Sequence, residues 1–157
     1  KAGADCLLIG ANTMHKIADK VQASVTRPVI HIASVTTEEI SQQQLKTVAL
    51  LGTKYVMQQD FYKEKLADRG INILIPEQDD IDYVNNAIYS EFGKGIFLPD
   101  TKKRFLQVID RLSAQGAMGV IFGCTEIPIL IQKEDCSIPV FDTTQIHAAA
   151  TVVVAVS

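Results

Sequence analysis

The sequence lacks a long apolar run, an excess of positive charge and a pattern of paired cysteines. No apolar run approaches the roughly 20 residues that a membrane-spanning helix needs, so we expect no membrane partner. The net charge of −3 offers no basic surface for nucleic acid. Three cysteines at unrelated spacings indicate neither a disulfide framework nor a zinc site. The first residues do not resemble a signal peptide, and we expect a cytoplasmic protein with reduced thiols.

Two distant segments of the chain are copies of each other. Residues 2–13 read AGADCLLIGANT, and residues 115–126 read QGAMGVIFGCTE. The identical positions are Gly3 with Gly116, Ala4 with Ala117 and Gly10 with Gly123. Each copy is followed by a second apolar segment that starts at a proline. After the last glycine one copy has Ala11 and the other has Cys124, so a duplicated unit is asymmetric where catalysis is expected.

Short apolar runs alternate with helical patterns along the whole chain. The apolar runs predict strands at residues 6–9, 29–32, 48–51, 71–75, 119–122 and 140–141. Helical spacing and capping residues predict helices at residues 13–25, 36–45, 54–68, 79–91, 101–115, 127–132 and 144–156. This alternation favours an α/β fold with mostly parallel sheet. A Rossmann nucleotide-binding domain is disfavoured, because no strand is followed by G-x-G-x-x-G and there is no Walker lysine.

The repeat predicts two pseudo-symmetric α/β lobes, each with a mostly parallel sheet flanked by helices. We expect residues 1–46 and 142–157 to form the remainder of the first lobe, whose start is expected before Lys1, and residues 47–141 to form the second. Ligands of open α/β sheets bind outside the carboxyl ends of the strands, which is where Ala11 and Cys124 fall. Pseudo-twofold symmetry then predicts an active-site cleft between the lobes.

The two loops offer donors that suit a small carboxylate. Backbone N–H groups at helix starts are joined by side-chain hydroxyl or amide groups of Asn12, Thr13, Thr53 and Thr125. Cys124 precedes a predicted helix, where a thiolate of low pKa is favoured and can act as a base or a nucleophile. The alternative for Cys124 is a small buried apolar side chain. Structural roles are expected for Cys6, Cys136, His15 and His31.

Four motifs together resemble the aspartate/glutamate racemase family, the cofactor-independent amino-acid racemases. They are GANTMH, VALLGT, GCTEIPIL and PVFDTTQIHA, which start at Gly10, Val48, Gly123 and Pro139. The resemblance covers nearly the whole chain and implies an active site between two lobes, with one acid/base residue from each. One residue removes the α-proton and the other delivers a proton to the opposite face. Neither pyridoxal phosphate nor a metal is implied.

The resemblance implies roles for individual residues. Cys124 matches the acid/base of the second lobe. The implied substrate-binding residues are Asn12, Thr13, Thr53, Thr125 and Glu126. Lys94 is a candidate for recognising the side-chain carboxylate, with a solvated loop cation as the alternative, and His147 is expected to line the cleft. The implied partner is a small dicarboxylic amino acid, aspartate or glutamate, and the family is compatible with a homodimer.

The chain departs from the family pattern at three places. Ala11 stands where the family has Cys or Thr, and a methyl group cannot transfer a proton. Val56 replaces a threonine whose hydroxyl binds substrate. The family's Gly-rich first strand is expected before Lys1. Three functions therefore remain open: a racemase, an enzyme that uses the Cys124 thiol on one face only, such as a decarboxylase, and a catalytically impaired carboxylate-binding paralogue.

Overall fold

The computed structural model describes residues 3–156. The strands are β1 (Leu7–Leu8), β2 (Val29–Ile30), β3 (Thr47–Gly52), β4 (Asn72–Leu74), β5 (Val120–Gly123) and β6 (Val140–Asp142). The α-helices are α1 (Ala18–Ser24), α2 (Ile32–Gln42), α3 (Lys54–Gln58), α4 (Asp60–Ala67), α5 (Gln78–Ser90), α6 (Pro99–Ala114), α7 (Ile127–Leu130) and α8 (Thr143–Ala155). Short 3-10 helices are η1 (Asn12–Ile17), η2 (Phe92–Lys94) and η3 (Lys133–Asp135).

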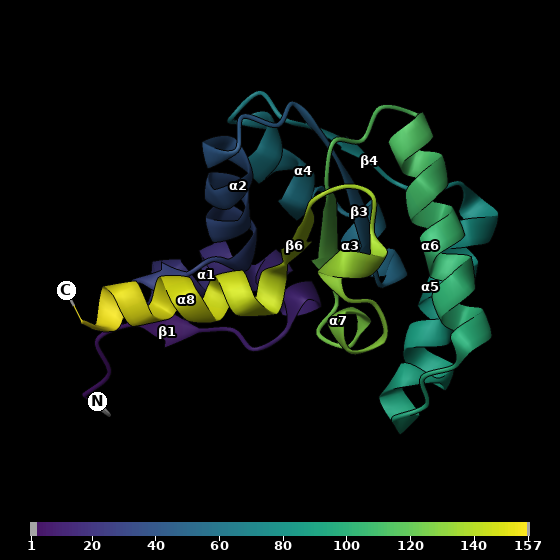
Figure 1. Ribbon diagram of the computed structural model, residues 1–157. Coiled ribbons are helices and arrows are strands. Elements are labelled where there is room, and N and C mark those ends of the chain that lie inside the picture. The colour runs from purple at the N-terminus through teal and green to yellow at the C-terminus, as the bar shows by residue number, and fades with distance from the viewer. Residues whose placement is uncertain (1–2, 157) are drawn as a thin grey trace.

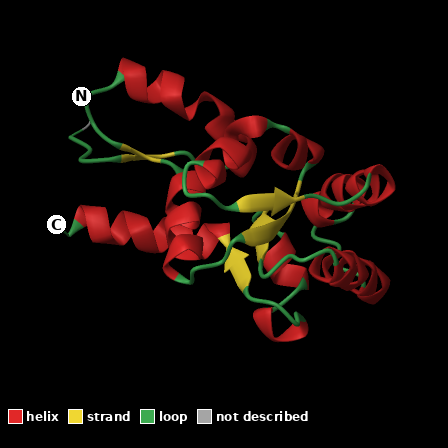
Figure 2. Cartoon of the chain, turned by 90° about the horizontal axis from the view of Figure 1, so that it is seen from above, coloured by secondary structure: helices red, strands yellow, loops and turns green. Residues whose placement is uncertain are grey.

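Every strand pairing is parallel, which confirms the predicted fold class. One sheet pairs β1 with β2, and the other has the strand order β4-β3-β5-β6. β5 is buried along its whole length, and only the first residue of β3 is partly exposed. Such continuous apolar strands are typical of parallel sheets that are covered on both faces. Figures 1 and 2 show α5 and α6 beside the four-stranded sheet.

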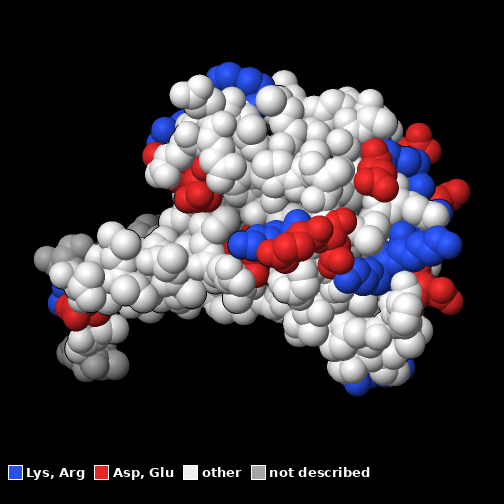
Figure 3. All heavy atoms as spheres, viewed as in Figure 1, with Lys and Arg blue, Asp and Glu red and all other residues white. Residues whose placement is uncertain are grey.

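The small sheet and α8 lie to one side of the four-stranded sheet. α8 packs against α2 and β2, and α2 in turn packs against α4 of the larger sheet. Figure 1 shows α8 running past β1 and α1 to the C-terminal end of the described chain. The far end of α8 exposes apolar side chains, and Figure 3 shows a largely uncharged surface there. Within residues 3–156 no helix is both long and apolar enough to cross a membrane.

The internal repeat is preserved in the backbone. Gly3 and Gly116, which begin the two copies, both have positive φ values, 75° and 104°. In each copy the strand then pairs with the next apolar segment in the same register. The matched pairs are Leu7 opposite Val29 and Val120 opposite Val140. Two sequences that share few side chains therefore form the same strand pair.

The second strand of each copy leads into a helix that starts in the same way. His31 precedes α2, and its Nδ1 accepts a hydrogen bond from the N–H of Ala33 at 3.2 Å. Asp142 precedes α8 and accepts one from the N–H of Thr144 at 2.9 Å. Both side chains satisfy an N–H group that the helix itself leaves unpaired. The two equivalent helices, α2 and α8, pack against each other.

Three predicted helices differ from the structure. The helix expected at residues 13–25 is the 3-10 helix η1 followed by α1. The helix expected from residue 36 begins at Ile32, because the cap at His31 ends β2 after two residues. The helix expected at residues 54–68 is two helices separated by the extended Gln59, with ψ 158°. Met57 and Tyr62 are both fully buried, although five helical positions place side chains on different faces. The extended residue re-aims the second helix so that both side chains reach the core.

Two glycines set the contact between the central strands. Gly52 lies opposite Gly123 where β3 and β5 end. A Cβ on Gly52 would lie 2.9 Å from the carbonyl oxygen of Gly123 and 3.0 Å from Val56 Cγ1. A Cβ on Gly123 would lie 2.8 Å from the same Val56 atom. Val56 is fully buried beneath these strand ends and therefore belongs to the core.

Replacing Gly52 with Ala should destabilise the fold. The added methyl group meets a main-chain oxygen that cannot move without shifting β5, so we expect unfolding free energy to fall by about 1 to 3 kcal/mol. Urea denaturation followed by circular dichroism measures the change. Gly93→Ala is the matched control, because its Cβ would have 3.5 Å to the nearest atom. Equal stability of the two variants would contradict the close strand contact.

Candidate functional site

A cleft of about 270 Å³ opens at the carboxyl ends of the central strands. It is lined by Gly10, Ala11, Asn12, Thr13, Thr53, Ile88, Tyr89, Gly93, Gly123, Cys124, Thr125 and Glu126. The first loop follows β1, and the second follows β5, so the cleft brings together residues from both sheets. Seven of the residues singled out in the sequence meet here: Ala11, Asn12, Thr13, Thr53, Cys124, Thr125 and Glu126.

The register of β3 and β5 positions the cleft residues that follow these two strands. Since Gly52 and Gly123 are paired, the next residues, Thr53 and Cys124, leave neighbouring strand ends together. The Thr53 hydroxyl accepts a hydrogen bond from the N–H of Val56 at 3.3 Å and thereby caps α3. The same hydroxyl lies 3.3 Å from that of Thr13. Thr53 thus connects the first loop to the larger sheet.

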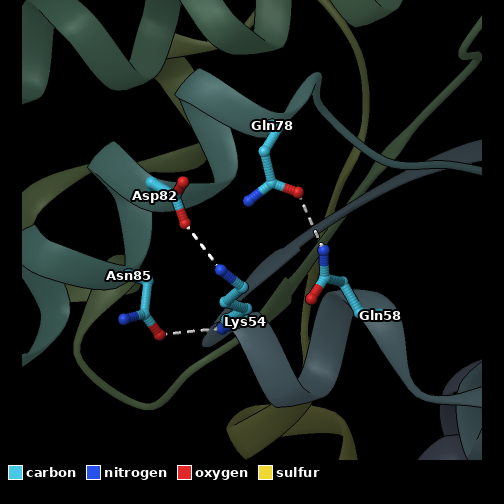
Figure 4. A network of polar contacts seen from close by, with 5 residues as sticks. All are labelled: Lys54, Gln58, Gln78, Asp82 and Asn85. Carbon is cyan, nitrogen blue, oxygen red and sulfur yellow. Dashed lines mark hydrogen bonds and ion pairs between the residues drawn. The ribbon is translucent and has the colours of Figure 1, made fainter.

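A polar network holds α3 against α5 and so fixes Thr53. The N–H of Lys54 donates to Asn85 Oδ1, and its Nζ donates to Asp82, both at 2.9 Å. Gln58 donates to Gln78 at 3.2 Å one turn further along α3 (Figure 4). The Lys54 and Gln58 side chains are exposed or half-buried, so the main-chain bond to Asn85 is the structural part of this network. It satisfies an N–H at the start of α3.

Asn12 joins the first loop to the protein interior through a buried chain of hydrogen bonds. The Tyr62 hydroxyl donates to Asn12 Oδ1 at 2.6 Å, and Asn12 Nδ2 donates to Thr143 Oγ1 at 3.0 Å. Thr143 in turn donates to the carbonyl of Phe122 at 2.8 Å. Sequence reasoning missed Tyr62, because it lies 50 residues from Asn12 and in a helix with no other site residue. The available signal was that Tyr62 lies on the apolar face of a predicted helix, where a buried hydroxyl group needs a hydrogen-bond partner.

Cys124 and Glu126 form the ionisable pair of the cleft. The thiol donates to Glu126 Oε2 at 2.9 Å and is 7% exposed. Burial, and then the hydrogen bond and charge of Glu126, raise the pKa of Cys124 to about 12. Burial opposes ionisation of Glu126, but hydrogen bonds from Cys124 and Thr125 outweigh it and lower the pKa of Glu126. The proton therefore rests on sulfur and the negative charge on the carboxylate.

The expected low pKa of Cys124 is wrong. The expectation relied on a helix start, but α7 has only four residues and begins at Ile127. Its N–H groups do lower the pKa, yet desolvation and Glu126 have the larger effect. A helix of one turn has a small dipole, and an adjacent carboxylate counteracts it.

The comparisons with known proteins show the family of the chain. The Asp/Glu/Hydantoin racemase family model matches residues 1–151. The chain belongs to this family. RacX of Bacillus subtilis, a broad specificity amino-acid racemase, is 24% identical over 152 residues, which are 97% of this chain and 65% of RacX. The chain therefore spans just under two thirds of this relative.

Two solved structures share the fold closely. A Yersinia pestis protein assigned as an Asp/Glu racemase is 43% identical, with a TM-score of 0.94, covering 99% of this chain and 68% of that one. An aspartate racemase homologue from Pyrococcus horikoshii is 33% identical, with a TM-score of 0.89, covering 99% and 69%. The resemblance that the motifs indicated is thereby confirmed, as is the two-lobed α/β arrangement.

Ala11 lines the cleft, and its carbonyl oxygen lies 3.0 Å from His15 Nδ1. The first loop is thus held in place, although the Ala11 side chain has no titratable group. Lys94 does not line the cleft, whereas its neighbour Gly93 does. Lys94 is exposed in η2, and Gly95 after it adopts a left-handed φ of 72°.

The three histidines lie together behind the first loop. The His15 ring centroid is 5.0 Å from that of His31 and 5.4 Å from that of His147. His147 does not line the cleft as expected, because its Nε2 lies 2.7 Å from the carbonyl of Ile30. Burial lowers the pKa of His15, and it lowers that of His31 to about 4. Across residues 3–156 no cluster of three His, Cys, Asp or Glu side chains could hold a metal ion.

Glu126→Gln should lower the pKa of the Cys124 thiol from about 12 toward its usual value. The amide keeps the side-chain volume but removes the charge that opposes the thiolate. Thiolate absorbance against pH measures the change in a Cys6→Ser, Cys136→Ser background, where Cys124 is the remaining thiol. Glu134→Gln, at an exposed residue outside the cleft, is the control. An unchanged titration would show that burial alone sets this pKa.

Proposed function

We propose that this chain transfers a proton at Cα of an acidic amino acid without a cofactor, with Cys124 as the acid/base on one face. The observation that carries the proposal is the Cys124–Glu126 hydrogen bond of 2.9 Å inside a small cleft. A carboxylate at this distance can accept the thiol proton and return it. The family and the racemases among its relatives support the reaction class.

Substrate binding would favour the thiolate form of Cys124. A thiol whose pKa is about 12 is a poor source of thiolate at neutral pH. The α-ammonium group of an amino acid brings a positive charge beside the thiol, which favours the thiolate. The thiolate can then remove the α-proton from its side of the substrate. Negative charge develops on the α-carboxylate, where the donors of Asn12, Thr13 and Thr125 would stabilise it.

The substrate class rests on the relatives and on one lysine. RacX has broad specificity, and the Pyrococcus protein is an aspartate racemase homologue. We propose aspartate or glutamate for this chain, with Lys94 receiving the side-chain carboxylate. Lys94 follows directly on Gly93, which lines the cleft, and its side chain is exposed.

Ala11 favours a second candidate function. With a methyl group at position 11, the face opposite Cys124 has no acid/base side chain at the family position. Cys124 would then remove and return a proton on one face only, which gives exchange without inversion or serves a stereospecific decarboxylation. A carboxylate-binding paralogue without proton transfer is the remaining alternative, and the donors of the cleft suit it equally.

Proton exchange in D2O tests the proposal. We expect the protein to replace the α-proton of at least one of L- and D-aspartate and L- and D-glutamate, measured by NMR. Cys124→Ala should slow this exchange by about 100-fold or more, because the base is gone. Cys136→Ala is the control, since this thiol lies outside the cleft. Exchange that survives in Cys124→Ala would contradict the proposal, and no exchange by folded protein would leave the carboxylate-binding alternative.

Chiral chromatography separates racemisation from one-face exchange. We expect Ala11→Cys to raise the rate of inversion by about 100-fold, because the second face gains an acid/base. Ala23→Cys adds a thiol at an exposed position of α1 and is the matched control. If inversion in Ala11→Cys stays at the rate of the unmodified protein while exchange continues, position 11 does not limit the reaction.

A further inference from the structure

We propose that Thr143 and Tyr62 are positioning residues, which together make Asn12 present an N–H group, and not an oxygen, to the cleft. The inference rests on the proposed function, because it specifies how the cleft recognises the α-carboxylate of its substrate. Three observations carry it. Asn12 lines the cleft, its side-chain amide is part of a buried hydrogen-bond chain, and that chain ends on a main-chain carbonyl.

The carbonyl of Phe122 fixes the direction of every bond in the chain. A carbonyl oxygen only accepts, so the one hydrogen of the Thr143 hydroxyl is used at 2.8 Å. Thr143 Oγ1 must therefore accept from Asn12, which places Nδ2 and not Oδ1 at 3.0 Å from it. Asn12 Oδ1 then faces Tyr62, whose hydroxyl must donate to it at 2.6 Å.

The reversed amide is unfavourable for the same reason. With Asn12 turned over, its oxygen would face Thr143, and two acceptors would compete for the single hydrogen of that hydroxyl. Either Asn12 Oδ1 or the carbonyl of Phe122 would remain buried without a donor. Tyr62 and Thr143 are both fully buried, and Asn12 is 5% exposed, so water cannot easily replace the missing bond. Burial also raises the pKa of Tyr62, which keeps its donating hydrogen in place.

One donor of Asn12 remains for a ligand. The Nδ2 group carries two hydrogens, and Thr143 uses one. The second belongs to a side chain that lines the cleft, so Asn12 offers a donor there. A donor suits a carboxylate and disfavours a positively charged group. Because Phe122 is two residues before Cys124, the chain also ties the first loop to the loop that carries the thiol.

Tyr62→Phe tests the role through KM and kcat separately. Without the hydroxyl, Asn12 Oδ1 has no donor in the native orientation, which then loses its advantage over the reversed one. We therefore expect KM for the amino acid to rise about tenfold while kcat changes less than twofold. Thr143→Val should act in the same direction, and Thr143→Ser, which keeps the hydroxyl, should restore KM. Tyr83→Phe, at a half-buried tyrosine against Phe105, is the control. Loss of kcat without a change in KM would overturn the inference.

A second measurement does not depend on activity. In 15N NMR the side-chain NH2 of Asn12, assigned with Asn12→Ala, should show one slowly exchanging hydrogen, the one bound to Thr143. Tyr62→Phe should speed its exchange about tenfold, and Tyr83→Phe should not. Equal exchange in all variants would overturn the inference. If the amide behaves as expected but no amino acid exchanges its α-proton, the proposed proton transfer fails while the orientation of Asn12 stands.

Discussion

The close pairing of two glycines is the constraint on which the site depends. Gly52 and Gly123 end neighbouring parallel strands, and neither has room for a Cβ. Their contact sets the separation of the two residues that follow, Thr53 and Cys124. Thr53 then meets Thr13 of the first loop through its hydroxyl. The position of the thiol relative to Thr53 and the first loop therefore depends on strand register and on the packing of the two glycines.

Buried polar groups connect the cleft to its surroundings. A hydrogen bond in the interior contributes little net stability when it is made and costs much when it is lost, so a fully satisfied chain selects one arrangement. The chain from Tyr62 to Phe122 has this character, whereas the exposed ion pair of Lys54 and Asp82 does not. His15 reinforces the same loop from behind, since its ring contacts the carbonyl of Ala11. The loop that carries Ala11 is therefore held both by the core and by His15.

The sequence predicts the elements that depend on local pattern and misses those that depend on distant partners. The apolar runs identified all six strands, and the repeat indicated two similar sheet pairings. The start of α2 was missed because a histidine cap is uncommon among the capping residues. Tyr62 was missed because its partner is 50 residues away. The raised pKa of Cys124 depends on burial and on the rotamer of Glu126, and neither can be read from spacing.

The two copies of the repeat share their backbone geometry but differ in the side chain that follows the last glycine. Both copies have a positive φ at their first glycine and the same strand register. Both also have a side chain that caps the following helix, which is His31 in the first copy and Asp142 in the second. These features require a backbone conformation or a lone pair, and several residue types supply them. A titratable side chain after the strand is a separate matter, and Cys124 has one while Ala11 does not. Both residues line the same cleft, so the shared backbone geometry of the two copies does not depend on which side chain stands at this position.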